Sequence, residues 1–248
     1  MKLLFLFLIL CVGTAKAQVG EYRSELAFGA GGGIVMSTVG FMPEVPQQQH
    51  KGFIGGLAVR YTSEKYFSSI CAVVAELNYA QVGWKEELLT PQDEPVINTV
   101  TGLPEEYQRN INYLQIPVFA RLGWGRERKG LQAFVQAGPQ VGIYLSENTK
   151  SNFSFDSRNK EKRTSPVVAQ DTMAVERKFD YGIAAGLGVE YSHPRLGHLI
   201  LEGRYYYGLG DIYGNSKRDY FGRSNLGTIV LKLTYLFDIA RTNNPKIK

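Results

Sequence analysis

The sequence predicts an all-β protein, an eight-stranded antiparallel transmembrane β-barrel with short periplasmic turns and long external loops. Three observations lead to this prediction. Eight segments alternate between apolar and polar residues, the connections between them alternate between long and short, and a secretory signal precedes them. An even number of strands is what closure of an antiparallel barrel in a bacterial outer membrane requires.

The composition supports strands and turns and excludes disorder. Among the 248 residues, 44% are hydrophobic and 21% are charged, and 27 Gly accompany 15 Tyr and 13 Phe but only 4 Met. Aromatic residues are typical of strands, and glycine is typical of turns and tight packing. The net charge of +5 is too small to indicate nucleic-acid binding without a clustered basic surface. We therefore expect no nucleic-acid partner.

The first 17 residues have the pattern of a signal peptide. Lys2 supplies the positive charge, Leu3–Val12 form the apolar stretch, and Ala15-Lys16-Ala17 provides the small residues at a cleavage site. Cleavage is expected between Ala17 and Gln18. Beyond residue 17 no stretch of 18 apolar residues is present, so the sequence predicts no transmembrane helix.

The alternation is clearest between Leu131 and Leu145, where every odd-numbered residue is apolar or small apart from Pro139, and the even-numbered residues include three Gln. Such a period of two places one face of a strand against an apolar environment and the other against a polar one. Three further segments share this contrast, and four show it more weakly. The expected strands are 26–36, 53–61, 71–83, 111–123, 131–145, 179–191, 199–209 and 228–237.

The connections support the same topology. They are expected to be long at 37–52, 84–110, 146–178 and 210–227, and short at 62–69, 124–130 and 192–198. Outer-membrane barrels alternate in this way between external loops and periplasmic turns. The expected organisation is a signal peptide at 1–17, a barrel at 18–237 and a short periplasmic C-terminal tail at 238–248.

A soluble lipocalin-like barrel is the main rival, because it also combines a signal peptide with eight alternating strands. The composition of the polar face distinguishes the two. This face is rich in Gly, Ala, Gln and Asn, which suits a narrow filled lumen, whereas a water-facing sheet would carry mostly Lys, Glu and Thr. We therefore expect a monomeric barrel in the cell outer membrane, with outer-membrane lipid and lipopolysaccharide as neighbours.

Four short motifs are similar to a known family. They are Tyr113-Leu114-Gln115-Ile116-Pro117, Ala137-Gly138-Pro139, Phe179-Asp180-Tyr181-Gly182 and Tyr205-Tyr206-Tyr207-Gly208-Leu209. In this order and spacing the chain resembles the PorT-like outer-membrane β-barrel family over roughly residues 20–237. The resemblance implies an eight-stranded outer-membrane barrel, mostly of undefined role; the namesake of the family takes part in a protein secretion system that exports proteases. It transfers no functional residues.

Pro117 and Pro139 lie inside two of the expected strands. Proline has no N–H group and removes one ladder hydrogen bond. The two strands share a short turn, so the two prolines are expected almost opposite each other. We expect a local bulge or a widened pairing there.

The sequence offers little support for enzymatic chemistry. It contains no nucleotide-binding, serine-hydrolase or zinc motif, so we expect no cofactor and no metal. His193 and His198 flank one short turn, where a weak metal site is conceivable but a solvated turn is the simpler interpretation. His50 lies at the outer rim, where a barrel-type lipid hydrolase would hold a His-Ser pair, but the sequence places no serine beside it.

The polar face carries a set of charged residues that parity directs into the lumen. Charges in a narrow interior must be paired, and we expect Arg204 and Lys232 to balance Glu190 and Glu202. A structural plug is the simpler interpretation, and an ion or proton path is the alternative. The expected lumen cluster consists of Arg60, Glu76, Arg121, Glu190, Glu202, Arg204 and Lys232.

Two expected external loops have opposite charge. Residues 84–109 carry a net charge of −4, and residues 158–163 carry +3. The loops could pair with each other, or the basic run could bind lipopolysaccharide phosphates or an acidic partner, or both could be solvated. Tyr213, Tyr220 and Phe221 in the last loop are candidates for a contact patch or an interfacial aromatic girdle.

Together these features predict a non-enzymatic outer-membrane barrel that acts as a structural or interaction scaffold through its external loops. One alternative is an accessory outer-membrane component of a protein secretion system, which would bind other envelope or secretion proteins. A second alternative is the barrel-type lipid hydrolase.

Overall fold

The computed structural model describes residues 21–126, 128–214 and 220–243. Ala17 and Gln18, at the expected cleavage site, lie outside these residues. Eight long strands dominate the structure: β1 (Glu21–Met42), β3 (His50–Tyr66), β4 (Ser69–Glu86), β5 (Tyr107–Gly125), β6 (Gly130–Ser151), β7 (Phe179–His193), β8 (Gly197–Asp211) and β9 (Arg223–Ala240). A two-residue strand, β2 (Gln47–Gln48), and a single 3₁₀ turn, η2 (Ala169–Asp171), complete the described elements.

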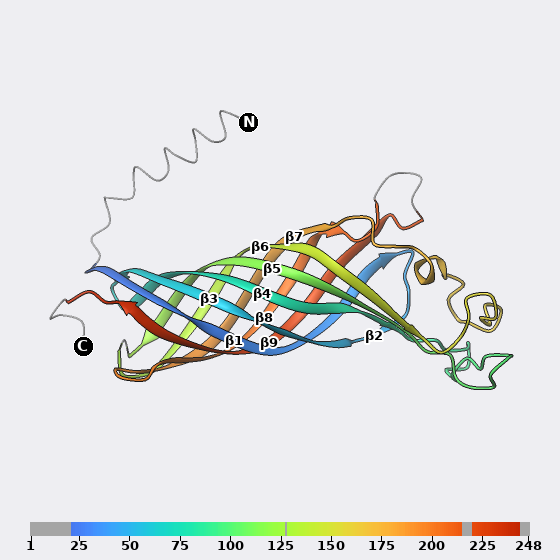
Figure 1. Cartoon of the computed structure of the whole chain (residues 1–248), viewed down its shortest axis with the longest axis horizontal. Helices are drawn as coiled ribbons and strands as arrows, with labels where there is room; N and C mark the ends of the chain where they lie inside the picture. The colour runs from blue at the N-terminus through green and yellow to red at the C-terminus, as the bar shows by residue number, and fades with distance from the viewer. Residues whose placement is uncertain (1–20, 127, 215–219, 244–248) are drawn as a thin grey trace, which may run out of the picture.

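The eight long strands form a closed antiparallel barrel (Figure 1). Their order around the ring is β4-β3-β1-β9-β8-β7-β6-β5, and the pairing of β4 with β5 closes it. The short strand β2 pairs with the end of β4. This closed ring confirms the predicted fold class, and closure removes the exposed sheet edges that an open sheet would present to the lipid.

The outward residues of β5 mark the extent of the membrane. From Trp124 to Leu114 every outward residue is apolar, and the next outward residues, Asn112 and Gln108, are polar. Ten residue steps of about 3.3 Å, tilted by about 40°, rise about 25 Å, which is the height of the apolar band of an outer-membrane barrel. The strands therefore continue beyond the membrane on the side of the long loops.

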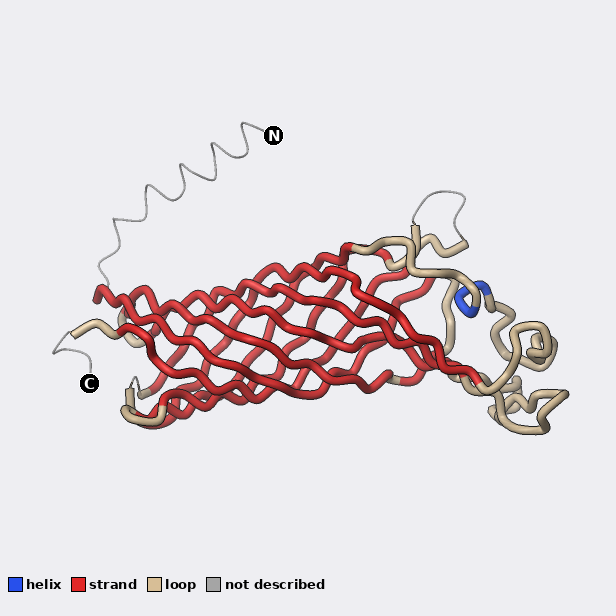
Figure 2. Tube along the Cα trace, in the orientation of Figure 1, coloured by secondary structure: helices blue, strands red, loops and turns tan. Residues whose placement is uncertain are grey.

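The long and short connections alternate as predicted. Long connections at 43–49, 87–106, 152–178 and 212–222 lie at one end of the barrel, and short ones at 67–68, 126–129 and 194–196 lie at the other (Figure 2). The short turn before β8 depends on Gly197, whose φ of 92° falls in the left-handed region that favours glycine. No helix in the described ranges is long and apolar enough to cross a membrane.

The two prolines lie at an interruption of the ladder in which no residue is inserted. Ladder pairing between β5 and β6 is interrupted between Pro117 and Ala120, yet the register is the same on both sides of the gap. Pro117 pairs with Gln140, one position away from Pro139. The register shift in this strand pair lies elsewhere, between Asn112 and Tyr113. The ladder is therefore interrupted at the prolines, and the bulge expected there is not present. The two backbones stay close at this point, because a Cβ atom added to Gly138 would lie 1.9 Å from the carbonyl oxygen of Val118.

Strands β1 and β9 approach each other closely because β1 carries inward glycines. A Cβ atom added to Gly33 would lie 2.0 Å from the carbonyl oxygen of Leu231. The same addition to the neighbouring Gly32 would meet its nearest atom at 3.5 Å, an ordinary contact. Gly33 thus permits the tight pairing beside Lys232, its partner in the ladder.

Candidate functional site

The structure brings the seven lumen charges together inside the barrel. All are buried, and they come from six of the eight long strands. Their ion pairs form one connected network across the lumen. The members are Arg60 on β3, Glu76 on β4, Arg121 on β5, Glu190 on β7, Glu202 and Arg204 on β8, and Lys232 on β9.

The half of this network nearer the short turns is centred on Glu190. Arg60 donates to Glu190 with an Nη1–Oε1 distance of 2.5 Å, and Arg121 approaches its other oxygen at 3.5 Å. Arg121 also donates twice to Gln136, at 2.9 and 2.7 Å, and its guanidinium lies 3.9 Å from the centre of the Phe134 ring. These contacts hold Arg121 across the lumen and fill its width.

The half nearer the external loops is centred on Glu76. Arg204 and Lys232 both donate to Glu76 Oε2 at 2.9 Å, and Lys232 also donates to Asn78 Oδ1 at 3.0 Å. Of the expected balance of Arg204 and Lys232 against Glu190 and Glu202, the contact between Arg204 and Glu202 is present at 3.6 Å. Glu190 pairs with Arg60 and Arg121 instead, and Lys232 pairs with Glu76. Parity assigns each residue to a face, but it does not determine how far along the barrel axis a tilted strand carries it.

A layer of aromatic side chains closes the barrel above this network. Phe41 contacts Trp84 and Phe221, with ring centroids 5.3 and 4.8 Å apart, and Tyr213 stacks on Phe221. Tyr213 and Phe221 are fully buried, so the prediction of an exposed patch or girdle is wrong for them; only Tyr220 is exposed. The lumen is thus filled by an ionic layer and sealed by an aromatic one.

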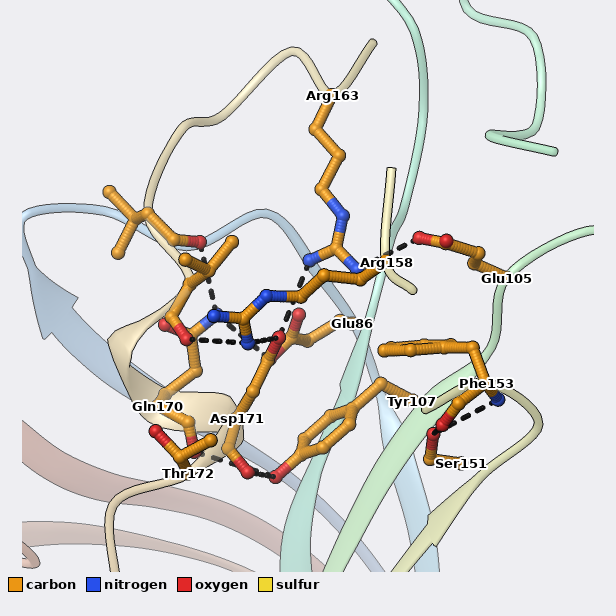
Figure 3. A network of polar contacts seen from close by, with 12 residues as sticks. Glu86, Glu105, Tyr107, Ser151, Phe153, Arg158, Arg163, Gln170, Asp171 and Thr172 are labelled. Atoms are coloured by element: carbon orange, nitrogen blue, oxygen red, sulfur yellow. Dashed lines mark hydrogen bonds and ion pairs between the residues drawn. The ribbon is translucent and has the colours of Figure 1, made fainter. Parts of the chain in front are cut away.

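The second and third long loops pack into one unit beyond the barrel, which we call the cap (residues 87–106 and 152–178). Arg163 donates to Glu105 with an Nη2–Oε2 distance of 2.9 Å, and both side chains are almost completely buried (Figure 3). Asn98 and the backbone N–H of Asn159 donate to the other Glu105 oxygen, at 2.9 and 2.8 Å. The sequence left open whether the two oppositely charged loops pair with each other, bind a partner or are solvated. At Arg163 the two loops pair with each other.

The cap is joined to the barrel through η2. Gln170 donates from Nε2 to Glu86 at 2.9 Å, and its carbonyl oxygen accepts from Arg109 at 3.1 Å. Asp171 pairs with Arg158 at 2.9 Å and with Arg163 at 3.6 Å. No sequence pattern predicts the roles of Gln170 and Asp171, because η2 lies in a loop without periodicity.

Glu86, above the apolar band, lies next to Asp171 in a buried position. Burial and the nearby Asp171 carboxylate raise the pKa of Glu86 to about 8, and burial also raises the pKa of Asp171. Glu86 is therefore protonated at neutral pH, and its carboxyl group can donate a proton to a hydrogen bond with the neighbouring Asp171 carboxylate. The two carboxyl groups act as a proton-dependent clasp between cap and barrel.

A serine does lie beside His50, contrary to the expectation from sequence. Ser37 Oγ is 3.3 Å from His50 Nδ1, and His50 Nε2 is 2.5 Å from Asn110 Oδ1. Ser37 is held by the backbone of Gly83, to which it donates at 3.0 Å and from which it accepts at 2.9 Å. Ser37 and His50 are each only 1% exposed, so a lipid ester has no path to this hydroxyl.

A second Ser-His pair lies near the short turns. Ser192 Oγ is 2.8 Å from His198 Nδ1, and His198 Nε2 is 3.0 Å from Asp238. Ser192 is fully buried. His198 also faces Glu190 at 2.8 Å, so it bridges two carboxylates rather than pairing with His193 around a metal. Within the described ranges, no group of three or more His, Cys, Asp or Glu side chains is arranged to hold a metal ion.

A closed eight-stranded barrel with an apolar exterior and a polar filled interior defines a small outer-membrane β-barrel protein. The chain belongs to the family described as "Outer membrane protein beta-barrel domain", whose sequence pattern matches residues 16–214. It is a protein of the cell outer membrane. No curated protein matches the chain.

Solved structures show similar barrels. Neisserial surface protein A is 11% identical, with a TM-score of 0.43 over 88% of this chain and 100% of that one. The attachment invasion locus protein Ail of Yersinia pestis is 15% identical, with a TM-score of 0.34 over 88% and 99%. OprG of Pseudomonas aeruginosa is 11% identical, with a TM-score of 0.38 over 88% and 98%. Similarity at this level gives no argument about the role of the chain.

Proposed function

We propose that this protein is a non-enzymatic, monomeric outer-membrane scaffold that binds a partner through its cap. The observation that carries the proposal is that the two loops form one packed body rather than two solvated loops. They are joined by the buried ion pair between Arg163 and Glu105 and by the hydrogen bond that the Asn159 N–H donates to Glu105. A body of this kind presents a fixed surface, and binding to a fixed surface costs less ordering entropy than binding to flexible loops.

We assign partner binding to the tip of the cap, which consists of Ile97, Val100 and Leu103. Val100 and Leu103 are 75% and 59% exposed, and Ile97 lies beside them in the same loop. These apolar residues project beyond the membrane, where lipid does not cover them. Lys160 and Lys162 are exposed on the other loop of the cap, so a protein with apolar and acidic groups fits this surface.

A photoreactive amino acid at position 103 tests this proposal in intact cells. We expect a covalent adduct of defined mass that the substitution Val100→Asp removes. Position 196 is a matched control, because Leu196 is 65% exposed in a short turn at the opposite end of the barrel. The absence of an adduct at 103, or the same adduct at 196, would refute binding through the tip.

The role in a secretion system is the second candidate. Its support is the ordered set of four motifs that the chain shares with the PorT-like family, including Phe179-Asp180-Tyr181-Gly182 on β7. The same adducts discriminate between the candidates, because a secretion component would be joined to other subunits of a machine that copurify from detergent-solubilised outer membrane. Adducts with a protein outside such a machine would favour the independent scaffold.

The lipid hydrolase is the least supported candidate. Its chemistry would need Ser37 or Ser192 to meet an ester carbonyl, and both hydroxyls are buried. Purified barrel in phospholipid vesicles should release no fatty acid above the level of a Ser37→Ala, Ser192→Ala double variant. Release that depends on either serine would restore the enzymatic interpretation.

A further inference from the structure

A small polar chamber opens at the end of the barrel that carries the short turns. It lies below the Glu190 half of the lumen network and is bounded by β1, β3, β4, β5, β6, β7 and β8, by the 126–129 turn and by the C-terminal segment. The charged groups that line it are Arg23, Glu25, Arg60, Arg121, Arg128, Glu190, His198 and Arg241. Above it, the pairing of Glu76 with Arg204 and Lys232 closes the lumen.

The chamber holds more positive than negative groups. Five arginines and one histidine line it, against two glutamates, and Glu25 pairs with Arg128 at 2.6 Å. Asp238, just outside the lining, is shared between His198 and Arg241. Glu202 reaches Arg121 only at 3.7 Å and is also 3.6 Å from Arg204. In the buried lumen network, four cations (Arg60, Arg121, Arg204 and Lys232) face three carboxylates (Glu76, Glu190 and Glu202). Buried guanidinium groups keep their charge, so this surplus of one positive charge calls for a counter-charge inside the barrel.

Glu190 illustrates the shortage of acceptors. Its two oxygens serve Arg60, Arg121 and His198 together. As a result, Arg121 Nη1 and Arg60 Nε are buried without a hydrogen bond, and Arg121 Nη1 reaches a Glu190 oxygen only at the ion-pair distance of 3.5 Å. Arg121 and Arg60 both line the chamber, and they are only 5% and 7% exposed. Buried N–H groups of charged side chains rarely remain without an acceptor.

The free space in the chamber is about 20 Å³, which suits one or two species of the size of water. Water would accept hydrogen bonds from Arg121 and Arg60, but it would not neutralise the surplus positive charge. We propose that this chamber binds a small inorganic anion of the size of chloride, entering from the short-turn end and held by Arg121 and Arg60. This inference goes beyond the proposed scaffold function and does not depend on it.

Bromide provides a direct probe, because it replaces chloride and scatters X-rays anomalously. Crystals of the full mature barrel soaked in sodium bromide should show an anomalous peak in the chamber, within hydrogen-bond distance of Arg121 Nη1. Bromide found only on the protein exterior, or no bromide at all, would overturn the proposal.

A solution experiment keeps the proposal testable without crystals. The temperature at which the unheated gel mobility is lost should be higher in sodium chloride than in sodium gluconate at equal ionic strength, with saturation as chloride increases. Arg121→Gln should abolish this difference. If that variant does not fold, Arg128→Gln at the chamber mouth takes its place and should reduce the difference. Arg126→Gln, an exposed arginine of the same turn, should leave it unchanged. Equal stability in both salts, or full replacement of chloride by phosphate, would contradict a site for a small anion.

Discussion

The Arg163 guanidinium donates to the Glu105 carboxylate across 2.9 Å, and the two residues belong to different external loops. Neither side chain is in contact with solvent to any appreciable extent. A buried pair of this kind ties the fold of one loop to the fold of the other, because each charge requires its partner. The cap should therefore open as a unit.

The first prediction concerns this pair. Arg163→Ala leaves Glu105 buried without its cation and should destabilise the cap by about 3–5 kcal/mol. Amide hydrogen exchange should become faster in both 87–106 and 152–178, while the strands of the barrel keep their protection. Lys162→Ala is the control, because Lys162 is exposed one residue away. Faster exchange in only one of the two loops would show that they are not coupled.

The second prediction concerns pH. The pKa of Glu86 is raised from 4.5 to about 8, so the closed cap retains a proton that the open cap loses at lower pH. Closure is therefore favoured at low pH and weakens as the pH rises from about 4.5 to about 8, with the opening constant increasing up to about tenfold per pH unit. Acrylamide quenching of buried Trp84, in a Trp124→Phe background that leaves a single tryptophan, should follow this opening.

Glu86→Gln supplies the control for this titration. The amide cannot ionise but still accepts the hydrogen bond from Gln170. Quenching of Trp84 in this variant should stay low and independent of pH across the same range. A pH dependence that persists in Glu86→Gln would assign the titration to another group.

The third prediction concerns the lumen network. Arg204→Ala removes one of the two cations on Glu76 and the 3.6 Å contact with Glu202. Two buried carboxylates then lose neutralisation, at a cost of about 3–5 kcal/mol. The temperature at which the barrel loses its unheated gel mobility should fall. Arg195→Ala, in an exposed turn, should leave that temperature unchanged, and equal temperatures for the two variants would show that the network contributes nothing to stability.

The fourth prediction compares two adjacent glycines. Gly33→Ala places a methyl group against the Leu231 backbone and should separate β1 from β9, at a cost of about 1–3 kcal/mol. Gly32→Ala meets only an ordinary contact and should be neutral. Refolding yield and thermal stability in detergent measure both variants. Similar losses in the two variants would point to backbone flexibility rather than to close strand approach.

The fold was largely predictable because a barrel strand has a period of two and each face has a single environment. Residues 131–145 and 179–191 show this directly, and the structure extends these strands beyond the predicted limits, to Ser151 and His193. The alternation does not predict the extension to Ser151, because strands that rise above the membrane face water on the outside, where the outward residues become polar and the alternation disappears.

The lumen charges could be assigned to the interior by parity, but their partners could not. Partners such as Arg60 and Glu190 are 130 residues apart and meet across the barrel, which depends on strand tilt rather than on sequence spacing. From the sequence, only the opposite net charges of the two loops indicated that these loops pair to form the cap. The roles of Gln170 and Asp171 gave no sequence signal, because an irregular loop has no periodicity to reveal which side chains turn inward.

The central claim is that the barrel is a sealed scaffold and not a channel. Purified, refolded protein in a planar lipid bilayer tests it most directly. Because an ionic layer around Glu76 and Glu190 and an aromatic layer around Phe41 fill the lumen, the account predicts no stable conductance above that of the bare bilayer. Stable, ion-selective conductance in the unmutated protein would contradict it.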